Sequence, residues 1–283
     1  MGRRGDGFHL LDSLIGFAAI HDEILARPAI ELSLAINGPF AGDLAAEDDN
    51  LVLRAARALS AAHAGVPQGT GAAITLVKNL PVASGIGGGS SDAAAELRIL
   101  DALWGLQTPA AELAAIAAGL GADVPVCLAA CTAFVGGIGE QVDEAPPLPD
   151  VGLVLANPGV ALSTAEIFAA SAGDIPDRAD TVRIDAMAQD AAALARQLAQ
   201  TGNDLSAAAC RQAPMVVDVL DAIGAAPGCL LSRLSGSGAT CFGLFADVAA
   251  AAAAADRIGR AHPGWWVRGT EFIGRAPEIE EIA

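Results

Sequence analysis

The sequence has few positive charges. Its 283 residues include 16 lysines and arginines against 33 aspartates and glutamates, which gives a net charge of −17 at pH 7. So acidic a protein repels the phosphates of nucleic acids, and we expect no nucleic-acid partner. A ligand that itself carries several phosphates would need local cations or a metal ion. Lys78 is the single lysine, because the other basic residues are all arginines.

Cysteine pairs and long apolar segments are also lacking. No Cys-x-x-Cys pair occurs, and the cysteines show no metal-ligand spacing with the four histidines. We therefore expect reduced and mostly buried thiols. The sequence has no signal or transit peptide and no apolar run of about 18 residues, so we predict a cytoplasmic location and no membrane partner. The five cysteines are Cys127, Cys131, Cys210, Cys229 and Cys241.

The chain can be divided into two halves, separated by a candidate linker. With 53% hydrophobic residues, the chain can bury one large core or two modest cores. The best candidate for a linker is segment 143–150, because its three prolines and three acids cannot build a regular element. In the first half, the patterns predict strands and helices at 30–36 (strand), 50–62 (helix), 72–77 (strand), 91–104 (helix) and 109–119 (helix).

The second half has a different order of elements. Its patterns predict an alanine-rich helical region at 163–226, a helix at 247–261, and strands at 151–156, 230–234 and 265–268. This order indicates an α+β sandwich with helices on one face of a largely antiparallel sheet.

A glycine-rich loop joins the strand at 72–77 to the helix at 91–104. Gly85, Gly87, Gly88 and Gly89 allow positive φ and close backbone approach, and the free N–H groups of the following helix can bind phosphate. Residues 90–92, Ser-Ser-Asp, are predicted to lie at the N-cap. The alternative is an ordinary flexible turn. No Gly-Lys-Ser/Thr follows, and Asp101 lies within the predicted helix, so neither a Walker A nor a dinucleotide-binding site is expected.

Several motifs together resemble the GHMP kinases. Loop 81–91 resembles the phosphate loop of that superfamily, and its companions are 121–125 (Gly-Ala-Asp-Val-Pro) and 235–240 (Ser-Gly-Ser-Gly-Ala-Thr). Segments 2–9, 47–51 and 163–168 resemble those of the GHMP kinases that act on cytidylated methylerythritol, almost from end to end. The resemblance implies a two-domain α+β fold. An ATP-binding domain would span 1–145, and a ferredoxin-like substrate-binding domain would span 146–283.

The resemblance also implies a reaction. ATP would phosphorylate the 2-hydroxyl of cytidylated methylerythritol, a small-molecule substrate of the non-mevalonate isoprenoid pathway. Asp123 matches the catalytic aspartate, which accepts or orients the hydroxyl proton; taken alone, it would be a cap or turn residue. Mg²⁺ is the implied metal, with Ser91 as a candidate ligand. The positions that match ATP-binding residues are Asn50, Leu51, Lys78, Pro81, Val82, Ala83, Ser84, Gly85, Ile86, Gly87, Gly88, Gly89, Ser90 and Ser91.

Four residues match the substrate-binding positions of these kinases. Phe8 and His9 match an aromatic–histidine pair that holds cytosine, Phe168 matches the aromatic on the other face, and Thr164 matches a substrate contact. The chain has Phe8 where the family commonly has tyrosine, and it contains no tyrosine. Without the resemblance, Phe168 would be read as a core residue, His9 as a solvated or capped histidine and Lys78 as a surface lysine at a strand end.

The chain departs from the family pattern at its start. Family members carry a Pro-Ala-Lys-x-Asn segment ahead of the Gly-Arg-Arg motif, whereas Met1 directly precedes Gly2 here. In the family, the lysine of that segment faces the transferring phosphoryl group beside the catalytic aspartate. No residue of this chain can be assigned that role, so we expect that the native gene product is longer and that the present form is a weak kinase. The alternatives are another small-molecule GHMP kinase and a nucleotide-binding protein with little catalysis. The resemblance leaves a monomer or a homodimer open.

Two other parts of the second half recur in the family. The glycines and threonine of 235–240 are predicted to support the substrate pocket or the phosphate loop, and a purely structural turn is the alternative. Asn203-Asp204-Leu205 has no predicted chemical role, and we interpret it as a helix cap.

Overall fold

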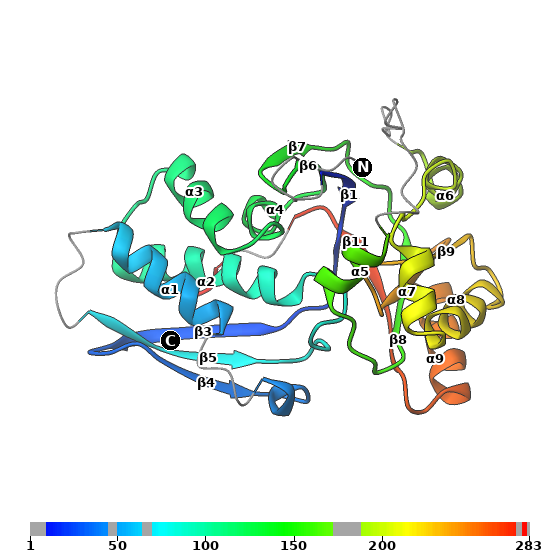
Figure 1. The fold of residues 1–283 in the computed structure, drawn as a ribbon, viewed down its shortest axis with the longest axis horizontal. Coiled ribbons are helices and arrows are strands. Elements are labelled where there is room, and N and C mark those ends of the chain that lie inside the picture. Colours follow the sequence, from blue (N-terminus) through cyan, green and yellow to red (C-terminus); the bar gives the residue numbers. More distant parts are fainter. Residues whose placement is uncertain (1–9, 45–49, 64–69, 172–187, 276–278, 282–283) are drawn as a thin grey trace.

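The structure is a computed structural model that describes residues 10–44, 50–63, 70–171, 188–275 and 279–281. Within these ranges the strands form three sheets, with helices packed on them (Figure 1). The predicted α+β class is confirmed. None of the helices in the described ranges is long and apolar enough to span a membrane.

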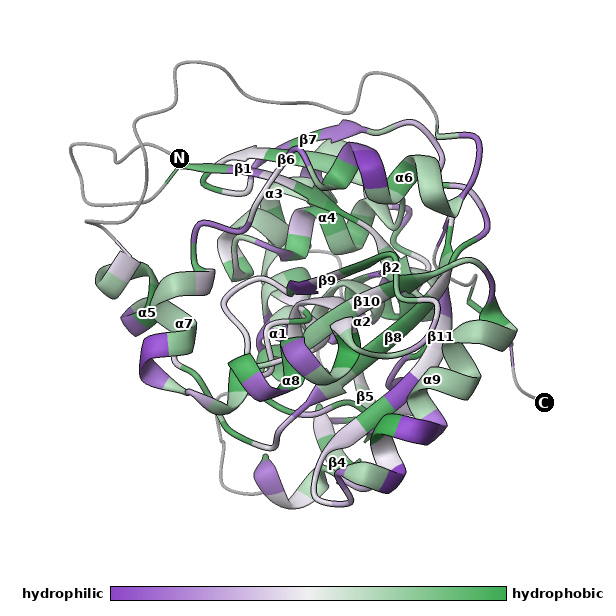
Figure 2. Ribbon diagram, turned by 90° about the vertical axis from the view of Figure 1, so that its right-hand side faces the viewer, coloured by the Kyte–Doolittle hydropathy of each residue, from purple (hydrophilic) through white to green (hydrophobic). Residues whose placement is uncertain are grey.

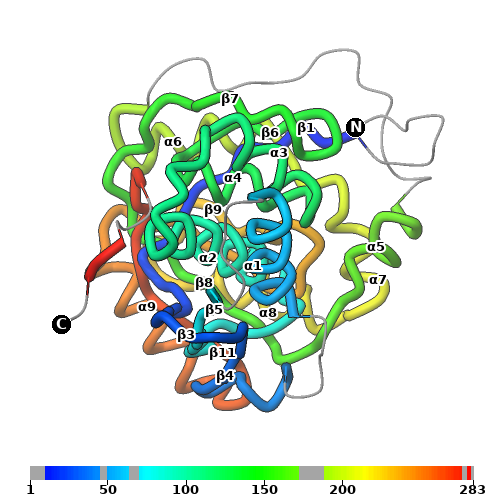
Figure 3. The backbone as a smooth tube through the Cα atoms, turned by 90° about the vertical axis from the view of Figure 1, so that its left-hand side faces the viewer, coloured from blue at the N-terminus to red at the C-terminus, as the bar shows by residue number. Residues whose placement is uncertain are grey.

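The first sheet carries the helix that follows the glycine loop. Its order is β3 (Glu23–Ala29), β5 (Gly71–Val77) and β4 (Ser33–Asn37), with β5 antiparallel to β3 and parallel to β4. Helices α1 (Leu51–Ala62) and α2 (Gly88–Trp104) cover one face, as Figures 1 and 3 show. α3 (Ala110–Leu120) and α4 (Val124–Ala129) add to the same apolar core.

The second sheet places α4 beside the amino-terminal strand. It consists of β1 (Leu11–Ile15), β6 (Ala133–Gly137) and β7 (Gln141–Glu144), all antiparallel. Val126 of α4 packs with Ala133 and Val135 of β6 in a small buried cluster. A short 3-10 helix, η1 (Ala41–Asp43), follows β4.

The third sheet is fully antiparallel and holds the second core. Its order is β2 (Phe17–Ala18), β11 (Trp266–Ile273), β8 (Gly152–Asn157), β10 (Cys241–Phe245) and β9 (Leu231–Leu234). The two strands β8 and β10, in the middle of the sheet, are among the most hydrophobic segments in Figure 2. A Cβ atom at Gly269 would lie 2.8 Å from the Ala252 Cα atom, so the missing side chain lets a helix approach β11 closely.

Helices cover both faces of the third sheet. Val154 and Ala156 of β8 pack in the cluster that includes α8 (Met215–Gly224), α9 (Val248–Ala261), α5 (Thr164–Ser171) and α7 (Ser206–Gln212). Leu153 and Leu155, which alternate with them, pack against α6 (Ala191–Leu198). The prediction that helices lie on one face was therefore incomplete, because α6 covers the other.

Most predicted elements occur within a few residues of their expected bounds. The helix at 50–62 is α1, and Asn50 is its N-cap, since the Asn50 side chain accepts a hydrogen bond from Val52 N at 2.9 Å. The strand at 30–36 begins only at Ser33, because Ile30 is exposed. The candidate linker 143–150 overlaps the end of β7 and then continues without a regular element.

Two predictions about particular residues were wrong. Only Cys241 is fully buried, and the other four cysteines are partly exposed; all five are free thiols. The N-cap of α2 is Gly87, with φ +69°, and residues 90–92 lie in the first turn of the helix. The glycines themselves begin the helix, so the serine and aspartate side chains do not cap it.

Candidate active site

The N-terminus of α2 lines a large cleft, which is described below. The first glycine loop, residues 81–87, leads into this helix, and the first helical hydrogen bond runs from Ser91 N to Gly87 O at 2.9 Å. The preceding N–H groups therefore have no partner within the helix. Such a helix end attracts anions because its free donors and its dipole both favour negative charge.

A buried ion-pair network lies beneath this helix end. Lys78 Nζ lies 3.0 Å from Asp92 Oδ2 in the first turn of α2 and contacts Asp22 Oδ2 more closely. The other oxygen of Asp22 accepts hydrogen bonds from Asn79 N at 2.6 Å and from Leu80 N at 2.8 Å. All three charged side chains are at most 7% exposed. The network thus ties together the segment before β3, the end of β5 and the start of α2.

This network excludes the alternative interpretation of Lys78 as a surface lysine. Without the resemblance, Lys78 would be read as a surface residue, yet its side chain is 4% exposed and its ammonium group contacts two carboxylates. Burial is the main reason that the pKa of Asp92 rises from 3.8 to about 7, and the nearby Lys78 charge opposes that rise. Asp22 has no motif in the sequence to mark it, and sequence reasoning missed it.

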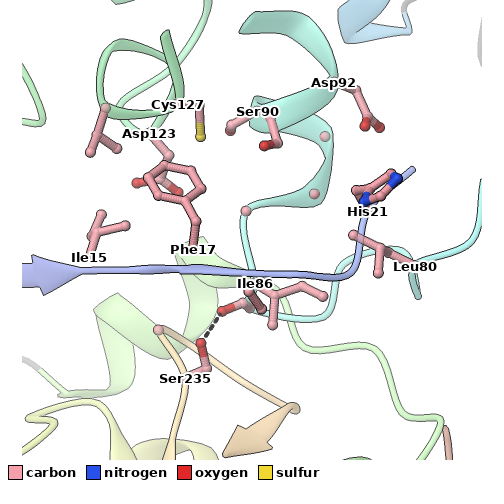
Figure 4. Close-up of a pocket in the computed structure, with 18 of the residues that line it drawn as sticks. Ile15, Phe17, His21, Leu80, Ile86, Ser90, Asp92, Asp123, Cys127 and Ser235 are labelled. Atoms are coloured by element: carbon pink, nitrogen blue, oxygen red, sulfur yellow. Dashed lines mark hydrogen bonds between the residues drawn. The ribbon is translucent and has the colours of Figure 1, made fainter. Parts of the chain in front are cut away.

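The second glycine loop, residues 235–240, holds the first. Ser235 Oγ donates to Gly85 O at 2.9 Å, as drawn in Figure 4, and Thr240 N donates to Ser84 O at 3.0 Å. Gly85 has φ +74°, and a Cβ atom there would lie 2.5 Å from Gly238 O. Only glycine fits this position, because both the φ angle and the close approach exclude a side chain.

Asp123 lies at the start of α4, on the cleft side. It occupies the N-cap position of α4, but its side chain makes no cap hydrogen bond. The carboxylate is therefore not used to cap the N–H groups of the first turn of α4. The side chain is reached by water from the cleft, and the surrounding protein still removes part of its solvation, which raises the pKa of Asp123 above 3.8. A carboxylate in this position can accept a proton from a bound hydroxyl group.

Two neighbours of Asp123 were not predicted from the sequence. In Figure 4 the Phe17 ring extends from β2 toward the Asp123 side chain, and Cys127 lies one helical turn further along α4. Burial raises the pKa of the Cys127 thiol to about 12, and the nearby Asp123 charge acts in the same direction. This thiol therefore stays protonated and is a poor nucleophile. Hydrophobic alternation could have indicated that Phe17 lies in a strand, but not the direction in which its side chain points.

One cleft of about 2190 Å³ brings most of the predicted site residues together. Its walls include the first glycine loop, Asp123, and the predicted ATP-binding residues Asn50 and Leu51. Thr164 and Phe168 of α5 line it from the other side. Phe8 and His9 lie outside the described residues.

The predicted substrate residues of α5 also have structural contacts. Thr164 Oγ1 lies 2.9 Å from Ser237 Oγ, so this residue is hydrogen-bonded to the second glycine loop. Phe168 is half-buried and packs against the second core while it lines the cleft. The interpretation of Phe168 as a core residue is therefore compatible with a surface exposed to ligand.

Comparison with protein families agrees with this arrangement. The model of the GHMP kinase N-terminal domain matches residues 50–130, which include the first glycine loop and Asp123. The model of the GHMP kinase C-terminal domain matches residues 184–264, which include the second glycine loop. A crystal structure of homoserine kinase from Cytophaga hutchinsonii shares the fold, with a TM-score of 0.67 and 19% identity over 90% of this chain and 87% of that one.

Individual relatives are more similar. A 4-diphosphocytidyl-2-C-methyl-D-erythritol kinase of Rhodospirillum rubrum is 47% identical over 98% of this chain and 90% of its own length. One of Cereibacter sphaeroides is 51% identical over 96% of this chain and 94% of its own. A crystal structure of a 4-(cytidine 5'-diphospho)-2C-methyl-D-erythritol kinase has a TM-score of 0.75 and 31% identity over 96% of this chain and 94% of that one. The chain belongs to the 4-diphosphocytidyl-2-C-methyl-D-erythritol kinase family of the GHMP kinases.

Proposed function

We propose that this kinase transfers the γ-phosphoryl group of ATP to the 2-hydroxyl of 4-(cytidine 5'-diphospho)-2-C-methyl-D-erythritol, in the non-mevalonate pathway to isoprenoids. One observation carries the proposal. A single cleft holds a helix end with free N–H donors and the Asp123 carboxylate, in a chain about half identical to named kinases of this substrate. Phosphoryl-transfer enzymes commonly combine a phosphate-binding backbone with a residue that orients the attacking hydroxyl, and these two features can supply both.

The first glycine loop and α2 hold the ATP phosphates in this proposal. The loop N–H groups and the helix dipole stabilise the charge on the phosphates. Asn50 and Leu51, at the start of α1, are assigned to the adenine side of the cleft. Lys78 supports the same region indirectly, because its ammonium group is occupied by Asp22 and Asp92.

Mg²⁺ fits the donors present near the helix end. No group of three or more His, Cys, Asp or Glu side chains that could hold a metal occurs in the part of the chain that the structure describes. Mg²⁺ in kinases is commonly held by substrate phosphates, waters and one or two protein oxygens. The Ser91 hydroxyl is the candidate protein oxygen, and the Asp123 carboxylate is assigned to the acceptor hydroxyl. When bound with ATP, the ion would neutralise charge on the transferring group.

Asp123 acts on the acceptor hydroxyl. Its carboxylate accepts or orients the proton as the hydroxyl oxygen approaches the γ-phosphorus, and the bond from that phosphorus to the bridging oxygen of ADP breaks. Because the transition state is loose, the main tasks of the protein are alignment and charge stabilisation. The raised pKa of Asp123 brings its basicity closer to the working pH, which favours this role.

The cytidine part of the acceptor is assigned to the α5 side of the cleft. Phe168 supplies one stacking surface and Thr164 a polar contact, and Phe8 and His9 are proposed to complete the site. This division places ATP in a domain at 1–145 and much of the acceptor site in a domain at 146–283. β2 nevertheless pairs with β11, so the amino-terminal part of the chain also contributes a strand to the third sheet.

An acceptor panel tests the proposal. ADP release should require cytidylated methylerythritol, and homoserine and mevalonate should give no more ADP than ATP alone. Asp123→Asn should lower kcat by about 10² to 10⁴-fold while the affinity for a non-hydrolysable ATP analogue stays within about threefold. Equal ADP release with and without the cytidylated acceptor would exclude the proposed reaction.

A further inference from the structure

The turn between α6 and α7 makes an unexpected contact with the second glycine loop. Asn203 Nδ2 donates to Leu234 O at 3.1 Å and to Gly236 O at 2.7 Å. Its Oδ1 accepts a hydrogen bond from Leu205 N at 2.9 Å. The N-cap of α7 is Leu205, so the segment Asn203-Asp204-Leu205 does contain the predicted helix cap. The Asn203 amide group also bridges two separate segments, with its donors and its acceptor all used.

The loop that Asn203 contacts is one that needs external support. Gly236 and Gly238 have φ +51° and +86°, so the loop depends on residues that restrict the backbone least. Hydrogen bonds from neighbouring elements therefore fix its conformation. One comes from Asn203, and another joins Ser237 to Thr164 of α5.

The same loop contacts the first glycine loop directly. Ser235 is the residue between Leu234 and Gly236, the two residues whose carbonyl groups Asn203 holds. Its hydroxyl donates to Gly85 O, and Thr240 N donates to Ser84 O. Asn203 is thus linked to the backbone of the proposed phosphate loop by its hydrogen bonds to residues 234 and 236, the covalent backbone between them, and the hydrogen bond from Ser235 to Gly85.

We infer that Asn203 is a positioning residue for the phosphate loop, acting through the second glycine loop and Ser235. Its two N–H donors fix the carbonyl groups on both sides of Ser235, and the Ser235 hydroxyl then holds Gly85. The inference rests on the proposed role of the first glycine loop in binding ATP. It goes beyond that role because it assigns a function to a residue that contacts neither loop 81–87 nor Asp123 in the described contacts.

Asn203→Asp is the informative variant. The aspartate keeps the size of the side chain and the oxygen that accepts from Leu205 N, but it loses both donors to Leu234 and Gly236. If Asn203 served only its local turn, this variant would behave as the wild type. Asn203→Ser, which keeps a hydroxyl acceptor, replaces it if Asn203→Asp does not fold.

Two serine variants provide a matched pair. Ser235→Ala removes a 2.9 Å hydrogen bond to Gly85 O, and Ser232→Ala removes a 2.9 Å hydrogen bond to Leu220 O of α8. Both serines are partly buried and lie on or next to β9. Only the first bond reaches the phosphate loop, so Ser232→Ala controls for a general loss of stability.

The measurement is the dissociation constant of a non-hydrolysable ATP analogue with Mg²⁺, by calorimetry, beside the KM of each substrate. Asn203→Asp, which loses two hydrogen bonds, and Ser235→Ala, which loses one, should each weaken binding on the order of five- to tenfold, and Ser232→Ala by less than about twofold. The double variant Asn203→Asp/Ser235→Ala should bind the ATP analogue about as poorly as whichever single variant has the lower affinity, because both substitutions affect the same support of Gly85. The KM for the acceptor should change less than the KM for ATP.

Three results would overturn the inference. They are wild-type nucleotide affinity in folded Asn203→Asp, an equal loss in Ser232→Ala and Ser235→Ala, and losses that multiply in the double variant. Failure of the wild-type chain to bind the analogue would instead refute the assignment of the phosphate loop, and this inference with it. Normal binding by the wild type and by all variants would refute the inference alone.

Discussion

Glu96 gives the sharpest prediction about stability. It lies in α2 beside Ala93, Leu97 and Leu100 of the first core, and its side chain is fully buried. Neither carboxylate oxygen has a hydrogen-bond partner among the described residues. Burial raises the pKa of Glu96 from 4.5 to about 8, because no partner compensates the lost hydration of the charged form. Glu96 is therefore expected to be neutral in the folded protein at pH 7.

The magnitude follows from proton linkage. Between pH 4.5 and about 8 the folded state holds a proton on Glu96 that the unfolded state has released. Since the folded pKa is raised, the contribution to stability is complete below pH 4.5 and is lost as the pH rises toward 8. The free energy of unfolding should fall by about 1.4 kcal/mol per pH unit in this window, or about 3 kcal/mol by pH 7.

Glu96→Gln should remove this pH dependence, because the amide keeps the shape and cannot ionise. Urea unfolding, followed by far-ultraviolet circular dichroism under reducing conditions, measures both proteins across the window. The stability of Glu96→Gln relative to the wild type should rise by about 2–3 kcal/mol between about pH 5 and about pH 7. Asp256→Asn, which changes an exposed carboxylate on α9, should run parallel to the wild type. Parallel curves for Glu96→Gln and the wild type would refute the reasoning.

Three further predictions concern the site. Lys78→Met should destabilise the protein by about 3–5 kcal/mol in urea unfolding, because it leaves two buried carboxylates without a cation. A loss below about 1 kcal/mol would mean that water reaches the network. Gly85→Ala should abolish nucleotide binding, because the new Cβ atom would collide with the second glycine loop. A Cβ atom at Gly87 has nothing within 4 Å, so Gly87→Ala should keep nucleotide binding and cost only about 1 kcal/mol of stability, owing to its φ of +69°. Similar nucleotide affinities in the two variants would contradict the close packing of the loops. Phe168→Ala should weaken acceptor binding by about 1–3 kcal/mol and leave ATP affinity unchanged, as measured by calorimetry. Unaltered acceptor binding with a lower melting temperature would make Phe168 a core residue only.

The local parts of the site could be predicted from the sequence. The order of strand, glycine loop and helix depends on backbone freedom and helix-end donors, which are local properties, and it recurs as β5, the first glycine loop and α2. The start of α2 was misplaced because cap preferences favour Ser90 and Asp92 over glycine. Here Asp92 is held by Lys78 instead, and that contact belongs to the tertiary structure.

Long-range contacts of residues that no motif marks could not be predicted. Asp22 lies 56 residues from Lys78 in the sequence, in a segment without a motif. Asn203 lies 33 residues from Gly236, and its local pattern indicates only a helix cap. The position of α6 on the second face of its sheet was also missed, because an alanine-rich segment gives little indication of which face it covers.

The phosphorus NMR spectrum of a single reaction mixture tests the central claim most directly. With ATP, Mg²⁺ and cytidylated methylerythritol, the account predicts that ADP and one new phosphate monoester on the 2-hydroxyl form in equal amounts. It also predicts that Asp123→Asn forms far less of both while it still binds the ATP analogue. Release of inorganic phosphate without a phosphorylated acceptor, or equal product from Asp123→Asn, would contradict the account.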